Sequence, residues 1–163
     1  MIGFIRQFAK DARGAASSEF VLAIPMILPL IFGSMEAGNF FWSQQKLTQS
    51  VRDGARFASR QNYGLICPNL DSDLETDIKN ITRTGLLSGG TSKLPGWENS
   101  EIDVVPNCGA FTAGGIYSGY GGAGAIVTVR AVGVPYRSIL GALGVIDDTY
   151  KLAAEVHSPV IGI

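Results

Sequence analysis

The chain has 163 residues, of which 46% are hydrophobic, and its formal net charge at pH 7 is −1. This length allows one modest folded domain beside a membrane segment, and it excludes two full domains. Lys and Arg total 13 against 14 Asp and Glu, and no basic block follows the first residues, so nucleic acid is not an expected partner.

The N-terminal region joins small residues to an apolar run of nearly membrane length. Gly14 is followed by four small residues and then by the carboxylate of Glu19. The uncharged run that begins at Phe20 and ends at Met35 would rise about 24 Å as a helix, slightly less than a hydrocarbon core of about 30 Å. The aromatic cluster at 40–42 suits the outer membrane interface. Basic residues before Gly14 place the leader in the cytoplasm.

The order of these features differs from that of a secretory signal. In a secretory signal the small-residue cleavage site follows the apolar segment, which is then discarded. Here the small residues come first. A cut after Gly14 would therefore remove residues 1–14 as a leader peptide and leave Ala15 at the start of a protein that keeps its apolar segment.

Two prolines, Pro25 and Pro29, lie inside the apolar run. Each removes a backbone donor, and lipid tolerates this only when other groups satisfy the freed carbonyls. Packed neighbouring subunits would supply such groups. Alternatively, the prolines simply bend a lone anchor.

The helix is expected to continue beyond the membrane. Apolar residues recur at helical spacing, at Leu47, Val51, Ala55 and Ala58. We therefore expect a helix from about 18 to 61 that ends near 62–64, so that residues 15–62 form a transmembrane and extended amphipathic helix. Residues 63–163 would form a periplasmic α+β domain.

A second, shorter helix is predicted from Asp71 to about Thr84. Ser72 and Glu75 have the spacing of a capping box, and Gly85 can end the helix. The acidic residues near its start provide favourable charge at the positive helix end. They lack the spacing of a calcium loop.

The remaining segments predict a small antiparallel sheet. A short strand over 102–105 is expected to end at Pro106, and further strands are expected over 125–134 and 148–157. Residues 136–145 between the last two would form a short helix or lie on the membrane-proximal surface. The glycine-rich segment 109–124 is expected to form a flexible hairpin tip. Trp97 is expected to be a loop residue that packs on the core. The fold class is thus α+β, with about three strands covered by the helices.

The two cysteines, Cys67 and Cys108, both follow the apolar segment. An even count in an exported domain indicates a disulfide, which would stabilise the domain by about 4 kcal/mol in the chain-entropy model. The single histidine, His157, has no accompanying nucleophile motif and is expected on a strand surface. We therefore expect no enzyme, no cofactor, no metal site and no small-molecule substrate.

The pattern of Gly14, four small residues, Glu19, Phe20 and an early Pro25 resembles a type IV prepilin peptidase site of Tad/Flp pilus systems. The continuation through residue 60, with Glu36, Gly38 and the stretch RDGARFA, resembles the TadE-like family. The resemblance implies a pilin-like protein, a single-pass location in the bacterial inner membrane, and a periplasmic C-terminal domain. The implied partners are the prepilin peptidase, other pilins or pseudopilins, and the Tad assembly platform.

The resemblance also implies a role for Glu19, whose carboxylate would pair with the amino terminus of a neighbouring subunit during assembly. Alternatively, Glu19 marks the solvated end of a membrane helix. The function expected overall is that of a pseudopilin or minor pilin in pilus initiation, assembly or adhesion, with incorporation into an extracellular pilus as one fate. The alternative is an uncleaved single-span envelope protein whose periplasmic domain binds a ligand or partner.

Overall fold

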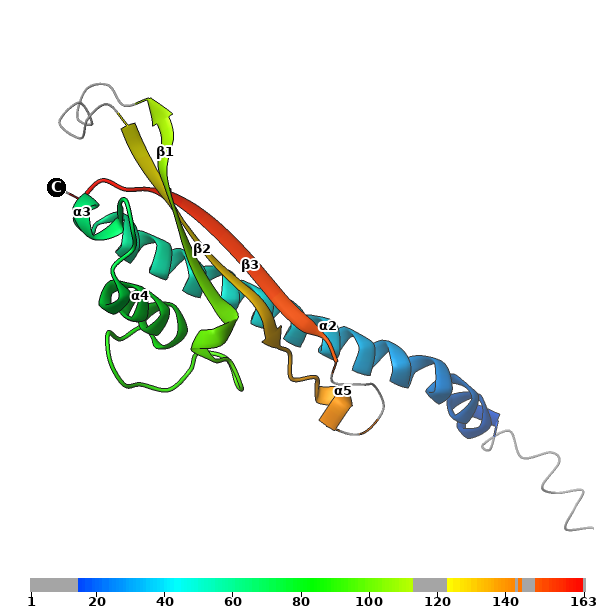
Figure 1. The fold of residues 1–163 in the computed structure, drawn as a ribbon. Helices are drawn as coiled ribbons and strands as arrows, with labels where there is room; N and C mark the ends of the chain where they lie inside the picture. Colours follow the sequence, from blue (N-terminus) through cyan, green and yellow to red (C-terminus); the bar gives the residue numbers. More distant parts are fainter. Residues whose placement is uncertain (1–14, 113–122, 143, 145–148, 163) are drawn as a thin grey trace, which may run out of the picture. The chain divides into compact units, whose positions relative to one another are not determined.

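The computed structural model describes residues 15–112, 123–142, 144 and 149–162. The chain divides into two compact units, Met1–Gly38 and Asn39–Ile163, which are described separately. The elements, labelled in Figure 1, are α2 (Ala15–Ser59), α3 (Tyr63–Ile66), α4 (Ser72–Thr84), the 3-10 turn η2 (Asn99–Glu101), β1 (Ile102–Thr112), β2 (Ala123–Pro135), α5 (Ile139–Ala142) and β3 (Lys151–Pro159). This architecture confirms the predicted α+β class.

The first unit contains the N-terminal part of α2. Pro25 and Pro29 both lie inside this helix. Each proline lacks the N–H that would bond to the carbonyl four residues earlier, so the carbonyls of Val21 and Pro25 lose their usual helical donors. The expected long N-terminal helix is confirmed, although it ends at Ser59 rather than near residue 61.

The second unit is built on a three-stranded antiparallel sheet with the order β1-β2-β3. The expected number and direction of strands are confirmed. The register of β2 with β3 shifts between Val132 and Val134. Gly133 lies in that bulge with a φ of 80°, a conformation that a residue without a β-carbon adopts most readily.

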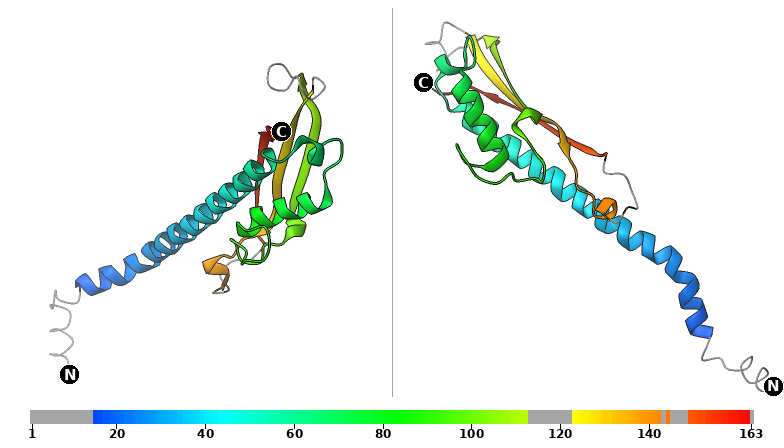
Figure 2. Two further views of the ribbon diagram at one scale, coloured as in Figure 1. Left: turned by 90° about the vertical axis from the view of Figure 1, so that its left-hand side faces the viewer. Right: turned by 60° about the horizontal axis from the view of Figure 1, so that its bottom comes forward.

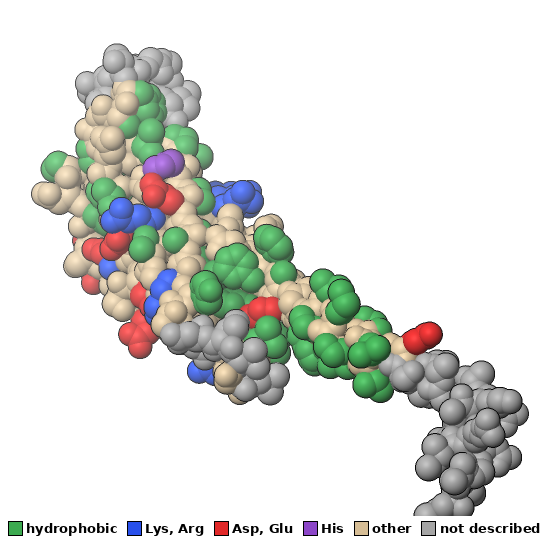
Figure 3. All heavy atoms as spheres, turned by 90° about the vertical axis from the view of Figure 1, so that its right-hand side faces the viewer, with side chains coloured by type: hydrophobic (Ala, Val, Ile, Leu, Met, Phe, Trp, Pro, Cys, Tyr) green, Lys and Arg blue, Asp and Glu red, His purple; other side chains and the backbone are tan. Residues whose placement is uncertain are grey.

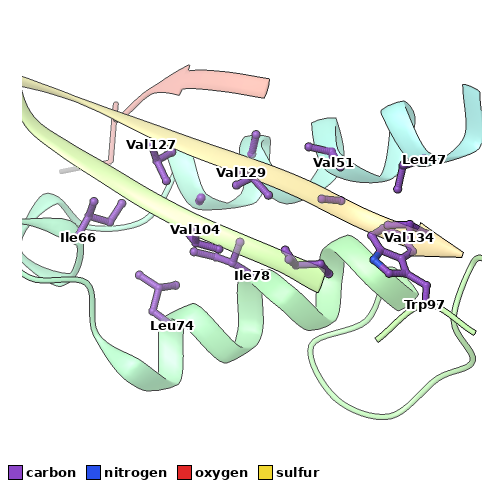
Figure 4. Close-up of a cluster of buried hydrophobic side chains, with 14 of the residues drawn as sticks. Leu47, Val51, Ile66, Leu74, Ile78, Trp97, Val104, Val127, Val129 and Val134 are labelled. Carbon is purple, nitrogen blue, oxygen red and sulfur yellow. The ribbon is translucent and has the colours of Figure 1, made fainter. Parts of the chain in front are cut away.

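One face of the sheet is buried under α2 and α4. The predicted helical stripe of α2 is fully buried, and Leu47 and Val51 lie in one cluster with Val127 and Val129 of β2 (Figure 4). From α4, Leu74 and Ile78 enter the same cluster. Figure 2 shows the two helices and the sheet from two further directions. The prediction that the helices cover the apolar face of the sheet is therefore confirmed.

The start of α4 corrects the predicted capping box. Asp71, not Ser72, is the N-cap, because its Oδ1 accepts hydrogen bonds from the backbone N–H groups of Asp73 and Leu74, both at 3.0 Å. Ser72 is already the first helical residue. A short carboxylate in extended backbone can satisfy two free helical donors, which leaves no such role for the hydroxyl. At the other end Gly85, with a φ of 85°, caps the helix as expected.

Strand β1 corrects a second expectation, since it passes through Pro106 and continues to Thr112. Pro106 stands opposite Val127 in the register. Because β1 is an edge strand, one of its sides has no partner strand, and a residue without an N–H can be accommodated there. Both ends of the glycine-rich segment belong to strands β1 and β2, while residues 113–122 lie outside the described residues.

The disulfide predicted from the cysteine count is confirmed. Cys67 follows α3 and Cys108 lies in β1, with their Cα atoms 5.8 Å apart. The bond ties the connection between α3 and α4 to the edge of the sheet. Trp97 is also placed as predicted: it is 2% exposed and belongs to the core cluster.

Candidate functional site

Of the residues predicted for processing, Ala15, Glu19 and Phe20 lie at the start of α2. Gly14 is outside the described residues, and Ala15 is the first residue of the helix. Positions 15 and 19 are one helical turn apart, so they share a face of the helix. The side chain of Glu19 is exposed, and Phe20 directly after it is 63% exposed. A carboxylate therefore marks the boundary between the small residues and the apolar run.

The apolar run presents its large side chains outward. Leu22, Met26 and Leu30 are 76%, 74% and 73% exposed, and they recur every four residues. Figure 3 shows hydrophobic side chains gathered along this part of α2. The helix is long and apolar enough to cross a membrane, and its most apolar window has no buried residue. A helix with this surface requires lipid or other protein chains around it.

Just after the apolar run, α2 carries the aromatic cluster that the sequence places at the interface. The rings of Phe40 and Tyr136 lie edge to face with centroids 5.4 Å apart. The Trp42 ring lies 4.7 Å from Nζ of Lys46, which is a cation–π contact. The sequence pattern does not show that Tyr136, almost 100 residues later in the chain, completes this cluster.

The RDGARFA stretch, residues 52–58 of α2, contains residues that pack in the core and residues that lie on the surface. Gly54 lies against Thr82 of α4, and Ala55 and Ala58 are fully buried. Asp53 forms a salt bridge with Lys93, in which Oδ2 of Asp53 lies 3.2 Å from Nζ of Lys93. Within the described part of the chain, this stretch therefore fixes α2 against the domain.

His157 is on the exposed surface of β3, as expected. Its Nδ1 lies 2.8 Å from Thr128 Oγ1 on β2, and its Nε2 lies 3.3 Å from Glu155 Oε1. Thr128 and His157 are register partners, so this contact is a cross-strand pair that depends on sheet register. The side chains of His157 and Glu155 are 63% and 48% exposed, and a hydrated pair of this kind contributes at most about 1 kcal/mol.

The described part of the chain shows no cluster of side chains suited to binding a metal ion. Among its His, Cys, Asp and Glu residues, no group of three or more could hold an ion. Both cysteines are committed to the disulfide.

Comparison with known proteins finds a family similarity in the N-terminal part of the chain. Residues 14–56 match the model of a family described as TadE-like protein. This confirms the resemblance expected from the sequence. No curated protein and no solved structure matches the chain. The matched segment includes the apolar run, the aromatic cluster and most of the RDGARFA stretch.

Proposed function

We propose, from the membership of residues 14–56 in the TadE-like family, that this chain is a pseudopilin or minor pilin of a Tad (Flp) type IV pilus. The family match associates the chain with Tad pili. The finer proposal is that it is a non-enzymatic subunit that acts in initiation, assembly or adhesion of the pilus.

The observation that carries this proposal is the unburied apolar part of α2 directly after Glu19. A helix whose apolar side chains are exposed can lie in lipid and later pack against the equivalent helices of other subunits. In the proposed sequence of events, the prepilin peptidase cuts between Gly14 and Ala15 and releases the cytoplasmic leader 1–14. The remaining helix holds the protein in the bacterial inner membrane until it enters the assembly platform.

The disulfide supports a periplasmic position for the folded domain. Disulfides form and persist in oxidising compartments such as the periplasm and are rare in the cytosol. The bond between Cys67 and Cys108 lies entirely in the second unit. With the leader in the cytoplasm, the chain would cross the inner membrane once.

The proposal is tested by the mass of the protein purified from cells that make or lack the prepilin peptidase. We expect loss of residues 1–14, with Ala15 as the new amino terminus, only when the peptidase is present. Gly14→Val should block the cut. Gly33→Ala is a matched glycine control, because a β-carbon at position 33 meets nothing within 4 Å.

An intact Met1 in cells that make an active peptidase would contradict the processing step and favour an uncleaved envelope protein. Cleavage without recovery of the protein in pili or in complex with other pilins would contradict the assembly role.

A further inference from the structure

The connection between β2 and β3 is attached to α2 immediately after the apolar run. Asn39 Nδ2 donates hydrogen bonds to the hydroxyl of Tyr136 at 2.9 Å and to the carbonyl of Arg137 at 3.1 Å. The ring of Phe40 packs edge-on against Tyr136. Two successive residues of α2 therefore hold the start of this connection in place.

The position of Asn39 in the chain fixes the depth of that attachment. A hydrocarbon core of about 30 Å takes about 20 helical residues. Counted from Phe20, such a span ends at Asn39, and the uncharged run itself ends four residues earlier at Met35. If α2 spans the membrane, the hydrocarbon ends between Met35 and Asn39, so Asn39 lies at its outer boundary or within about 6 Å outside it. Any group within hydrogen-bond distance of Asn39 must then lie at the same boundary.

The side chains at this level have the chemistry of a membrane interface. Phe41 and Trp42 on α2 are 68% and 59% exposed, and Ile139 on α5 is 37% exposed. Tyr150, whose carbonyl accepts a hydrogen bond from the Tyr136 N–H at 3.1 Å, is 60% exposed. Aromatic side chains with polar tips concentrate in the headgroup region, where one end of the ring is in water and the other is in hydrocarbon.

Positive charge accompanies these apolar groups. Arg137 is exposed and directly precedes the buried Ser138, whose Oγ accepts a hydrogen bond from the Gly141 N–H at 2.8 Å at the start of α5. Lys46 lies one turn beyond Trp42 and contacts its ring. Basic groups beside interfacial aromatics attract the phosphates of anionic lipids.

We propose that residues 136–142 form a second contact with the membrane that α2 spans, and that they sit in the outer-leaflet headgroups beside Phe41 and Trp42. The partner is a bilayer containing anionic phospholipid. This inference rests on the proposed function in one respect, since it requires α2 to be inserted. It adds that the folded domain contacts the bilayer at a second point beside α2, which restricts the tilt of the domain relative to the membrane.

The test measures how deeply position 139 lies in a bilayer. The full chain is reconstituted into vesicles of phosphatidylethanolamine and phosphatidylglycerol, with or without bromine atoms high on the acyl chains. Tryptophan fluorescence is compared for the parent, Ile139→Trp and the control Leu65→Trp. Leu65 is 45% exposed in α3, and α2 rises about 25 Å between Trp42 and its end, so the control position lies far from the bilayer.

We expect the tryptophan added by Ile139→Trp to lose at least twice the fraction of its emission that the Leu65→Trp tryptophan loses. Arg137→Glu, combined with Ile139→Trp, should reduce this quenching. Equal quenching at the two positions would overturn the inference. An emission shift that depends on protein density and not on brominated lipid would also overturn it, because the surface would then bind a second copy of the chain.

The parent protein separates failure of this inference from failure of the proposed function. Trp42 lies on α2, whereas Trp97 is buried in the domain and serves as an unquenched background. Quenching of Trp42 without quenching at position 139 refutes the second contact and leaves the membrane anchor intact. If neither position is quenched, α2 is not inserted and both proposals are wrong.

Discussion

Gly54 of α2 packs against Thr82 of α4 so closely that a β-carbon at position 54 would overlap Thr82 Oγ1. The Thr82 side chain is fully buried, and its hydroxyl donates a hydrogen bond to the carbonyl of Ile78 at 2.7 Å. That hydrogen bond holds the hydroxyl in its present rotamer. The approach of the two helices therefore depends on a glycine in α2 and on the orientation of one side chain in α4.

Substituting Gly54 by alanine should destabilise the domain, because overpacking that forces either the threonine or the helix to move costs about 1–3 kcal/mol. The gain in helix propensity from glycine to alanine, up to about 1 kcal/mol, opposes this loss and is smaller. Thermal unfolding of the purified protein followed by circular dichroism measures the effect.

Gly38→Ala is the matched control for this prediction, because a β-carbon there meets nothing within 4 Å; it should not lower the melting temperature. Adding Thr82→Ala to Gly54→Ala removes the overlapping oxygen. The double variant should then lose less stability than the sum of the two single variants, by at least about 0.5 kcal/mol. Strict additivity would contradict the proposed contact.

The disulfide makes a separate contribution to stability. Cys67 and Cys108 are 41 residues apart, and closing a loop of that length stabilises a domain by about 4 kcal/mol in the chain-entropy model. Replacing both cysteines with serine should lower the free energy of unfolding in urea by roughly this amount. Reductant should destabilise the parent and leave the double variant unchanged. A parent protein with two free thiols, purified without reductant, would contradict this assignment.

The sequence predicted most of the fold because its strongest signals are local. Leu47, Val51, Ala55 and Ala58 recur at helical spacing, and all four are fully buried. The alternation in the last strand likewise places Leu152 in the core and His157 on the surface. These periodicities result from one-sided burial, which leaves a direct pattern in the sequence.

Features that depend on the position of an element in the fold were not predictable. Pro106 was expected to end its strand, and only the place of β1 at the sheet edge explains why it does not. The contacts of Asn39 with Tyr136 and Arg137 join residues 97 and 98 positions apart. No spacing rule connects such residues, because the intervening sheet sets their proximity. The matched segment 14–56 includes only one partner of each contact.

The cap of α4 offers a test between the sequence-based expectation and the structure. Asp71→Ala should destabilise the domain by about 1 kcal/mol, since it leaves the N–H groups of Asp73 and Leu74 without their acceptor. Ser72→Ala should change stability much less, because Ser72 is the first helical residue and not the cap. Urea unfolding of both variants provides the comparison. A larger loss for Ser72→Ala would restore the capping box that the sequence suggested.

The exposed carboxylate of Glu19 stands at the start of the apolar run. A charge near the edge of the bilayer is costly unless it is paired or hydrated. In the proposed pilus subunit, the carboxylate is paired with the amino terminus of a neighbouring subunit after cleavage at Gly14. Glu19→Ala and Glu19→Gln should therefore still enter the membrane fraction, since the apolar run is unchanged, but should be absent from sheared pili.

Glu19→Asp is the control for charge, because it keeps the carboxylate one methylene closer to the helix. It should retain more of the protein in pili than Glu19→Gln does, whereas a role limited to side-chain size would give the opposite order. Immunoblots of membrane and sheared-pilus fractions give both readings from one culture. Because the mass of each variant also reports cleavage at Gly14, a loss from pili with normal cleavage assigns the defect to assembly rather than to processing. Normal amounts of Glu19→Ala in pili would show that the carboxylate only marks the solvated end of the helix.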